Sequence, residues 1–257
     1  MVALLTVFSL LTLTPWPSFS VGGLKSGERL SSAETVARLK RMQDRWIPFH
    51  LMMSGGIRCR TDFDVNQYFT LLNSLTPETG WTLDYVYDCN ELGGSPLLYA
   101  RRKWAVPFLT YSAYRNANPK ITSEEETDFL SHIKTDGTPE GFLQFAVLRI
   151  MADQFYLYWH AGYNDERIVY DRTQLDTLLA KQDIFKKPTA EERQKATSLD
   201  LQPVVTMTDK SVRVSLLTWT NWGGLYRKTF TISNAFPHRI EKEEKEQIVS
   251  YFCGIIF

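Results

Sequence analysis

The order of hydrophobic periodicities along the chain constrains its fold most strongly. Segments of helical spacing and short alternating segments are mixed over residues 31–198, whereas the last third alternates in long runs. The alternating runs there are Val204–Met207, Val212–Trp219 and Leu225–Ile232. Alternation places successive side chains on opposite faces of a strand, and the chain lacks the regular strand–helix repeat that builds parallel sheets. The sequence therefore predicts an α+β fold, with a mainly antiparallel sheet, several helices and a β-rich C-terminal third.

Three capping boxes predict where helices begin. A capping box places a side-chain acceptor three residues before a Glu or Gln, so that the two side chains satisfy each other's free backbone amides. The motifs are Ser31–Glu34, Asp64–Gln67 and Thr122–Glu125. Apolar residues at helical spacing follow each motif. We expect helices over 31–47, 64–75 and 122–133.

A fourth helix is predicted to be the centre of the core. Thr138 and Pro139 have the pattern of an N-cap followed by Pro at the first helical position. The segment that follows, up to Ala152, is apolar on nearly every face except at Gln144 and Arg149. A helix that is apolar all round is buried on all sides.

Two β-hairpins and two shorter helices complete the predicted elements. Alternating residues over 81–88, a Gly-rich turn and residues 97–101 predict the first hairpin. Residues 154–160, a turn and residues 167–170 predict the second. Asp171 and Thr189 are placed to cap the two helices.

The first 20 residues have the composition of a secretory leader. Residues 1–14 carry no charge and are rich in Leu, two prolines follow, and Ser18 and Ser20 offer small side chains before Val21. We therefore expect a signal peptide over 1–20, a polar linker over 21–30 and a single α+β domain over 31–257. Secretory leaders normally begin with a basic residue, but the first basic residue here is Lys25. A buried N-terminal segment is therefore the alternative interpretation. The expected location is secreted or periplasmic.

Charge and composition restrict the classes of partner. The chain has 29 basic and 29 acidic residues, so no positive excess is available to neutralise a phosphate backbone. We expect no nucleic-acid partner, and no segment is apolar for long enough to predict a transmembrane span. The partners that remain are a small molecule, a glycan or a protein.

Three cysteines allow one disulfide if the protein is exported. Cys59 and Cys89 flank one predicted helix and one strand, so we favour that pair over Cys253. Three buried, inert thiols are an equally good interpretation. No Cys-x-x-Cys motif and no Cys/His cluster with zinc-ligand spacing occurs, so the sequence predicts neither a metal site nor a cofactor.

The candidate catalytic residues are few. No nucleophile elbow, zinc-protease motif or nucleotide-binding loop is present. His160 and Asp165 lie near a turn, where they could supply a general base and its acidic partner. Cys89 could form a nucleophilic couple with His160 only if the fold brings them together. An aromatic strand that ends in a polar turn explains His160 and Asp165 without chemistry.

One β-hairpin in the last third is a candidate binding surface. Trp219, Trp222 and Tyr226 surround its connection, and loops on a rigid sheet often carry binding residues. Large aromatic side chains also complete hydrophobic cores, which is the alternative interpretation. The sequence therefore predicts a non-catalytic ligand- or partner-binding domain, with a hydrolase that uses His160 and nearby carboxylates as the alternative.

Overall fold

The structure is a computed structural model that describes residues 31–119, 125–180 and 188–251. The predicted leader and linker, over 1–30, lie outside the described residues, as does Cys253. The following description concerns the unit Ser31–Phe257 alone. Its helices are α1 (Ser32–Gln43), α2 (Phe49–Met53), η1 (Val65–Thr70), α3 (Tyr111–Ala117), η2 (Glu125–His132), α4 (Pro139–Met151), η3 (His160–Asn164), α5 (Arg172–Ala180) and α6 (Ala190–Thr197), where η marks a 3-10 helix.

The strands form three antiparallel sheets. A two-stranded sheet pairs β1 (Leu75–Pro77) with β4 (Ile133–Thr135). A second sheet has the order β2-β3-β5 and consists of β2 (Trp81–Asn90), β3 (Gly93–Arg102) and β5 (Tyr158–Trp159). The C-terminal sheet has the order β10-β9-β8-β6, with β7 also paired to β8. Its strands are β6 (Arg167–Ile168), β7 (Val204–Met207), β8 (Ser211–Thr220), β9 (Gly224–Ser233) and β10 (Ile240–Ser250). The predicted α+β class, with antiparallel pairing and a β-rich C-terminal third, is confirmed.

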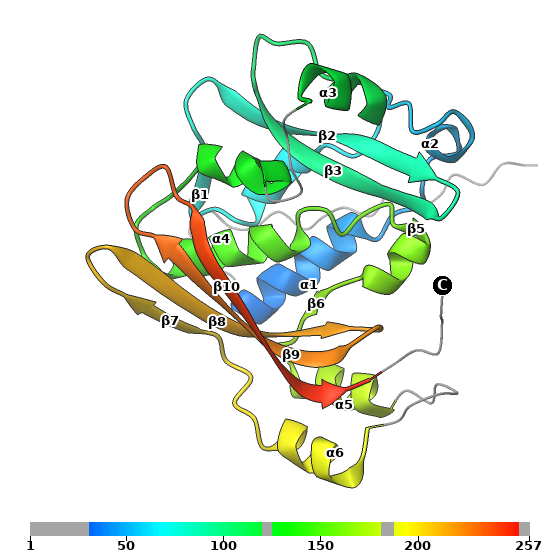
Figure 1. Cartoon of the computed structure of the whole chain (residues 1–257). Coiled ribbons are helices and arrows are strands. Elements are labelled where there is room, and N and C mark those ends of the chain that lie inside the picture. Colours follow the sequence, from blue (N-terminus) through cyan, green and yellow to red (C-terminus); the bar gives the residue numbers. More distant parts are fainter. Residues whose placement is uncertain (1–30, 120–124, 181–187, 252–257) are drawn as a thin grey trace, which may run out of the picture. The chain divides into compact units, whose positions relative to one another are not determined.

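Helix α4 lies between the β2–β3 hairpin and the C-terminal sheet (Figure 1). Thr138 caps it by accepting a hydrogen bond from the backbone N–H of Gly141 at 3.1 Å, and Pro139 occupies the first turn. Almost every side chain of α4 is buried in one hydrophobic cluster with side chains of α1, η1, β2, β8 and β9. Gln144 is also buried, and its carbonyl accepts from the backbone N–H of Ser74 at 2.9 Å. The predicted central helix is therefore present.

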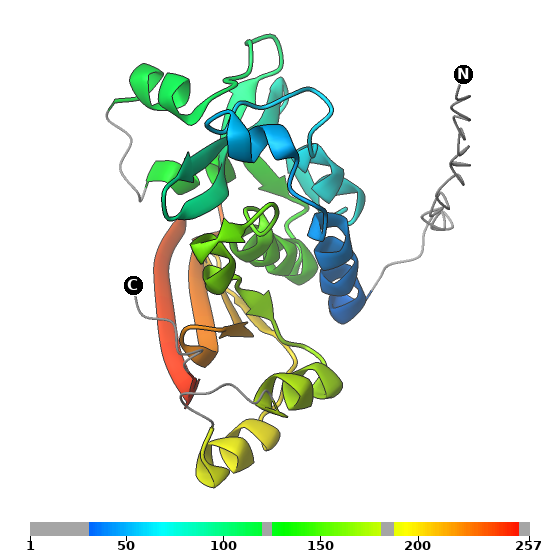
Figure 2. The ribbon, with the colours of Figure 1, turned by 90° about the vertical axis from the view of Figure 1, so that its right-hand side faces the viewer.

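Helices α5 and α6 pack at one end of the C-terminal sheet (Figure 2). A second hydrophobic cluster there contains Leu175 and Leu178 of α5, Ala196 of α6 and the fully buried Trp219 of β8. The cap predicted at Thr189 is present, and it is part of a capping box with Glu192.

The first helix is shorter than the sequence predicts. It was expected to run to residue 47, but α1 ends at Gln43, and Trp46 beyond it is 95% exposed. The side-chain amide of buried Gln43 donates to the Tyr68 hydroxyl at 2.8 Å and to a backbone carbonyl, which anchors the end of the helix. Pro48 restricts only the residue directly before it to extended backbone, so it does not account for the earlier end of α1 at Gln43.

The segment after α4 does not form the predicted hairpin. Only Tyr158 and Trp159 form a strand, and β5 pairs with β3, whereas β6 pairs with β8. Phe155 and Tyr156 are both buried in the main cluster, although alternation would place them on opposite faces. The chain achieves this with a left-handed backbone conformation at Tyr156, where φ is 51°. Burial of two aromatic rings therefore overrides strand geometry here.

A run of charged residues over 241–246 lies inside β10, which is the edge strand of the C-terminal sheet. Ion pairs hold this run to the rest of the sheet. Lys228 Nζ of β9 is 3.0 Å from Glu243, and Arg213 of β8 is 3.2 Å from Glu244. β-Propensity alone disfavours such polar residues in a strand. Their presence is explained by the edge position, because charged edge strands resist pairing with other chains.

Replacing Leu148 tests the central position of α4. Leu148 is 1% exposed, so Leu148→Ala should lower the free energy of unfolding by about 2–5 kcal/mol through lost transfer energy and a residual cavity. Leu92→Ala removes the same atoms from a side chain that is 64% exposed and should cost less than about 0.5 kcal/mol. Denaturant unfolding measures both, and equal effects of the two substitutions would contradict the buried position of α4.

Candidate functional site

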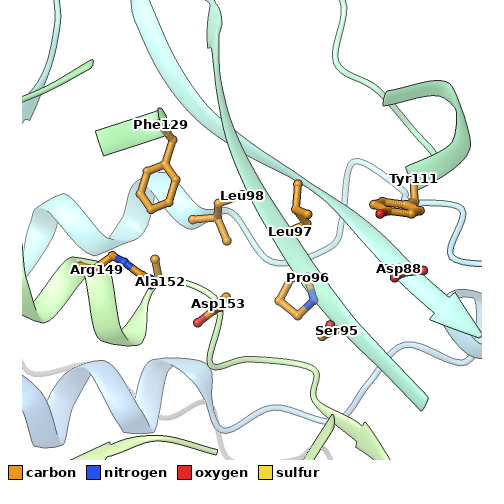
Figure 3. Close-up of a pocket in the computed structure, with 10 residues that line it drawn as sticks. All are labelled: Asp88, Ser95, Pro96, Leu97, Leu98, Tyr111, Phe129, Arg149, Ala152 and Asp153. Atoms are coloured by element: carbon orange, nitrogen blue, oxygen red, sulfur yellow. The ribbon is translucent and has the colours of Figure 1, made fainter. Parts of the chain in front are cut away.

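The outer edge of β3 borders a polar cavity. Strand β2 pairs with β3 over its whole length, from Trp81↔Arg102 to Asn90↔Gly93, whereas β5 pairs only with Gly93 and Gly94. A cavity of about 280 Å³ lies against β3 beyond that point (Figure 3). Its lining comes from β2, β3, α3, η2 and the end of α4. The lining residues are Asp88, Ser95, Pro96, Leu97, Leu98, Tyr111, Phe129, Arg149, Ala152 and Asp153.

Two carboxyl groups and one guanidinium group give this cavity its charge. Asp88 of β2 is directly opposite Ser95 of β3 in the antiparallel register, so both side chains project from the same face of the hairpin. Arg149 lies in the last turn of α4. Asp153 is four residues further along the chain, just beyond the end of the helix. In Figure 3, Arg149 and Asp153 lie on one side of β3, and Asp88 lies on the other.

Burial raises the pKa of both carboxyl groups. Desolvation is the cause at Asp88. Desolvation is also the larger effect at Asp153, where a hydrogen bond from the Gln154 amide to Oδ1 at 3.0 Å and the charge of Arg149 oppose it. A carboxyl group with a raised pKa keeps its proton to a higher pH, so it can donate as well as accept a hydrogen bond. Arg149 lies 3.7 Å from Glu243, and together with the two carboxyl groups it can bind the hydroxyl and oxygen atoms of a polar ligand.

A second cavity, of about 290 Å³, adjoins the first and contains His160. The two cavities share Asp88 and Ser95. The remaining lining residues of the second are Asn90, Leu92, Gly93, Gly94, His160 and Ala161. The fold therefore brings His160 close to Asp88, which is not the carboxylate that the sequence suggested. We call the two adjoining cavities the edge site.

Asp165, the expected partner of His160, is held by cations. It is buried, and its carboxylate binds Arg167 Nε at 2.8 Å and Lys40 Nζ at 3.4 Å. The ring of His160 packs edge-on against Trp159, which is itself 57% exposed. The ion pairs of Asp165 join the start of β6 to α1, which is a structural role.

Cys89 has the properties of a structural thiol. It is half-buried and packs against the main hydrophobic cluster. Burial and the adjacent carboxylate of Asp88 raise the pKa of its thiol. Since the thiolate is the nucleophile, a raised pKa leaves less of it at neutral pH. The predicted nucleophilic couple between Cys89 and His160 gains no electrostatic support.

Cys59 is exposed, and both it and Cys89 are free thiols in the structure, so the expected disulfide is not formed. The Cys59 thiol instead lies near His50 and Asp62, and one ligand atom from each of the three lies within 4.8 Å of the others. His50 Nε2 is 3.0 Å from Asp62 Oδ2, which also accepts from the backbone N–H of Cys59 at 2.7 Å. Sequence analysis missed this cluster because a carboxylate replaces the second cysteine of the usual Cys-x-x-Cys spacing.

The predicted aromatic surface at the β8–β9 connection is only partly available. Trp219 is fully buried against Tyr251, with ring centroids 4.9 Å apart, and therefore cannot contact a ligand in this conformation. Trp222 and Tyr226 are half-buried. The Tyr226 hydroxyl accepts from the Gln247 amide at 3.1 Å, and the Lys245 ammonium lies 4.0 Å from its ring centroid. These contacts fasten the hairpin to β10.

The chain was compared with models of protein families, with curated protein sequences and with solved structures, and none of them matches it. Within the described residues, every helix is too short or too polar to cross a lipid bilayer.

Removing the buried charge of Asp153 tests the electrostatics of the edge site. A carboxyl group with a higher pKa in the folded than in the unfolded protein binds more protons when folded, so its stabilising contribution falls as pH rises. Relative to Asp153→Asn, the wild type should therefore lose unfolding free energy as the pH rises above 3.8, the ordinary pKa of the group.

The measurement is denaturant unfolding at a series of pH values from 3.8 to neutrality. Asp209→Asn is the control, because it removes one negative charge at an exposed position in the β7–β8 turn. A stability difference between wild type and Asp153→Asn that stays constant with pH would contradict the raised pKa.

Proposed function

We propose that the protein binds a small polar ligand in the edge site. The observation that carries the proposal is that two carboxyl groups of raised pKa and one guanidinium group line a single cavity. A few convergent polar groups among apolar walls are typical of small-molecule sites. Burial of charged groups is costly to stability unless they are paired or hydrogen-bonded, and a polar ligand would add hydrogen bonds to the contacts that these groups make with Gln154 and Glu243.

A monosaccharide-sized, polyhydroxylated ligand suits this lining best. The cavity of about 280 Å³ is at the lower limit of ligand pockets, so large ligands do not fit. Arg149 and the Ser95 hydroxyl supply donors, and Asp88 and Asp153 supply acceptors, which matches the mixed donor and acceptor character of sugar hydroxyl groups. The apolar Leu98 and Phe129 offer a surface for the C–H face of a sugar ring.

Binding is favoured over hydrolysis by the state of the candidate catalytic groups. Asp165 is engaged by Lys40 and Arg167, and the raised pKa of Cys89 disfavours its thiolate. His160, Asp88 and Ser95 do line one cavity, so turnover remains an outcome that the binding experiment has to detect. The proposed location, outside the cytoplasm, is supported by the composition of residues 1–20 alone.

The test is saturation-transfer NMR of the wild-type protein with a panel of hexoses and N-acetylhexosamines, each at millimolar concentration. At least one sugar should bind, and Asp88→Ala should weaken it about tenfold or more, because a hydrogen bond to a charged group is worth about 1.5–3 kcal/mol. Asp209→Ala, which removes the same side chain at an exposed turn, should leave the affinity unchanged.

Two results would contradict the proposal. One is the absence of binding by every sugar of the panel, and the other is binding that Asp88→Ala leaves unaltered. Conversion of p-nitrophenyl glycosides added to the same samples, if abolished by His160→Ala, would establish the hydrolase in place of the binding protein.

A further inference from the structure

A second cluster of polar side chains lies outside the edge site, in the segment between α2 and η1. It consists of His50, Cys59 and Asp62, which we call the 50–62 cluster. His50 is part of α2, whereas Cys59 and Asp62 begin and end a turn in which the Asp62 N–H donates to the Cys59 carbonyl at 3.2 Å. The three ligand atoms lie within 4.8 Å of one another.

We propose that the 50–62 cluster binds one Zn²⁺ ion. The cluster offers an imidazole nitrogen, a thiol sulfur and a carboxylate oxygen, which are the three donor types that zinc accepts in proteins. The mixed nitrogen and sulfur donors favour a borderline-soft cation over Ca²⁺ or Mg²⁺, which require oxygen ligands. With three protein ligands, the fourth tetrahedral position is left for water or a small ligand.

The geometry needs only a small adjustment to hold zinc. Zinc–nitrogen and zinc–oxygen bonds of about 2.0–2.2 Å at a tetrahedral angle separate the two ligand atoms by about 3.4 Å. His50 Nε2 and Asp62 Oδ2 are already 3.0 Å apart. Cys59 is exposed and its side chain can rotate, so its sulfur can reach the about 3.6 Å that zinc–thiolate coordination requires.

The backbone around the 50–62 cluster is held in place independently of any metal. The guanidinium of Arg58, next to Cys59, donates a hydrogen bond to Asp84, and its central carbon lies 3.6 Å from the centroid of the Tyr85 ring. Its backbone N–H donates to the Leu109 carbonyl at 2.9 Å. The Asp62 side chain is only 2% exposed. A turn fixed to β2 in this way brings a thiol and a carboxylate together at little entropic cost.

The 50–62 cluster has a simpler interpretation, in which His50 and Asp62 form an ion pair and the Cys59 thiol binds no metal. A disulfide between Cys59 and Cys89 would also remove the sulfur ligand. Both alternatives predict that Zn²⁺ does not bind at this position. Zinc binding instead displaces the proton of the Cys59 thiol and any proton shared by His50 and Asp62.

The experiment is a titration of the reduced, full-length protein with Zn²⁺ by calorimetry, and with Co²⁺ by absorption spectroscopy. One ion should bind per chain, and Co²⁺ should give a thiolate-to-metal charge-transfer band. Cys59→Ser should abolish that band, and both Cys59→Ser and His50→Gln should lower the zinc affinity about tenfold or more, since even outer-shell changes cost 10–100-fold at metal sites.

Cys89→Ser is the matched control, because it removes a thiol outside the 50–62 cluster, and it should leave both the band and the affinity unchanged. Circular dichroism of each variant separates lost binding from lost folding. The proposal is overturned if the reduced wild type binds no zinc at micromolar concentrations, or if binding survives both Cys59→Ser and His50→Gln in folded protein.

Discussion

Burial of α4 on all its faces is the packing constraint on which the rest of the structure depends. A helix needs partners on every side that is apolar, and α4 has them in α1, the β2–β3 hairpin and the C-terminal sheet. Several polar side chains inside this packing form local hydrogen bonds. Gln144 binds the Ser74 backbone, and Gln43 binds Tyr68, whose hydroxyl donates to the carbonyl of Ala152 at the end of α4.

The edge site is a consequence of the same packing. The Met151 carbonyl fastens the end of α4 to α1, and the Ala152 carbonyl fastens it to η1, so the chain presents Arg149 and Asp153 at one fixed place beside β3. Strand β5 is too short to cover the edge of β3 beyond Gly94, so a cavity is left there. The 50–62 cluster is fixed instead by the contacts of Arg58 with β2. The two proposed sites thus rest on different parts of the β2–β3 hairpin, and each can be tested without the other.

Local signals in the sequence predicted the elements well where one pattern dominated. The cap at Thr138, the hairpin of β2 and β3 and the strands of the last third follow from spacing alone. Prediction failed where tertiary contacts overrode spacing, as at Tyr156, whose burial breaks a strand, and at Trp46, which α1 does not reach. Neither site could be predicted, because Asp88 and Asp153 line one cavity, and His50 meets Asp62, only through packing that periodicity does not encode.

Native-state hydrogen exchange tests the central role of α4 most directly. If both sheets depend on this helix, its amides from Phe142 to Met151 should be among the slowest to exchange and should open only with global unfolding. The amides of β10, which is an edge strand with mostly exposed side chains, should exchange through smaller local openings. Exchange in α4 that is faster than in β10, at a free energy well below that of global unfolding, would contradict this account.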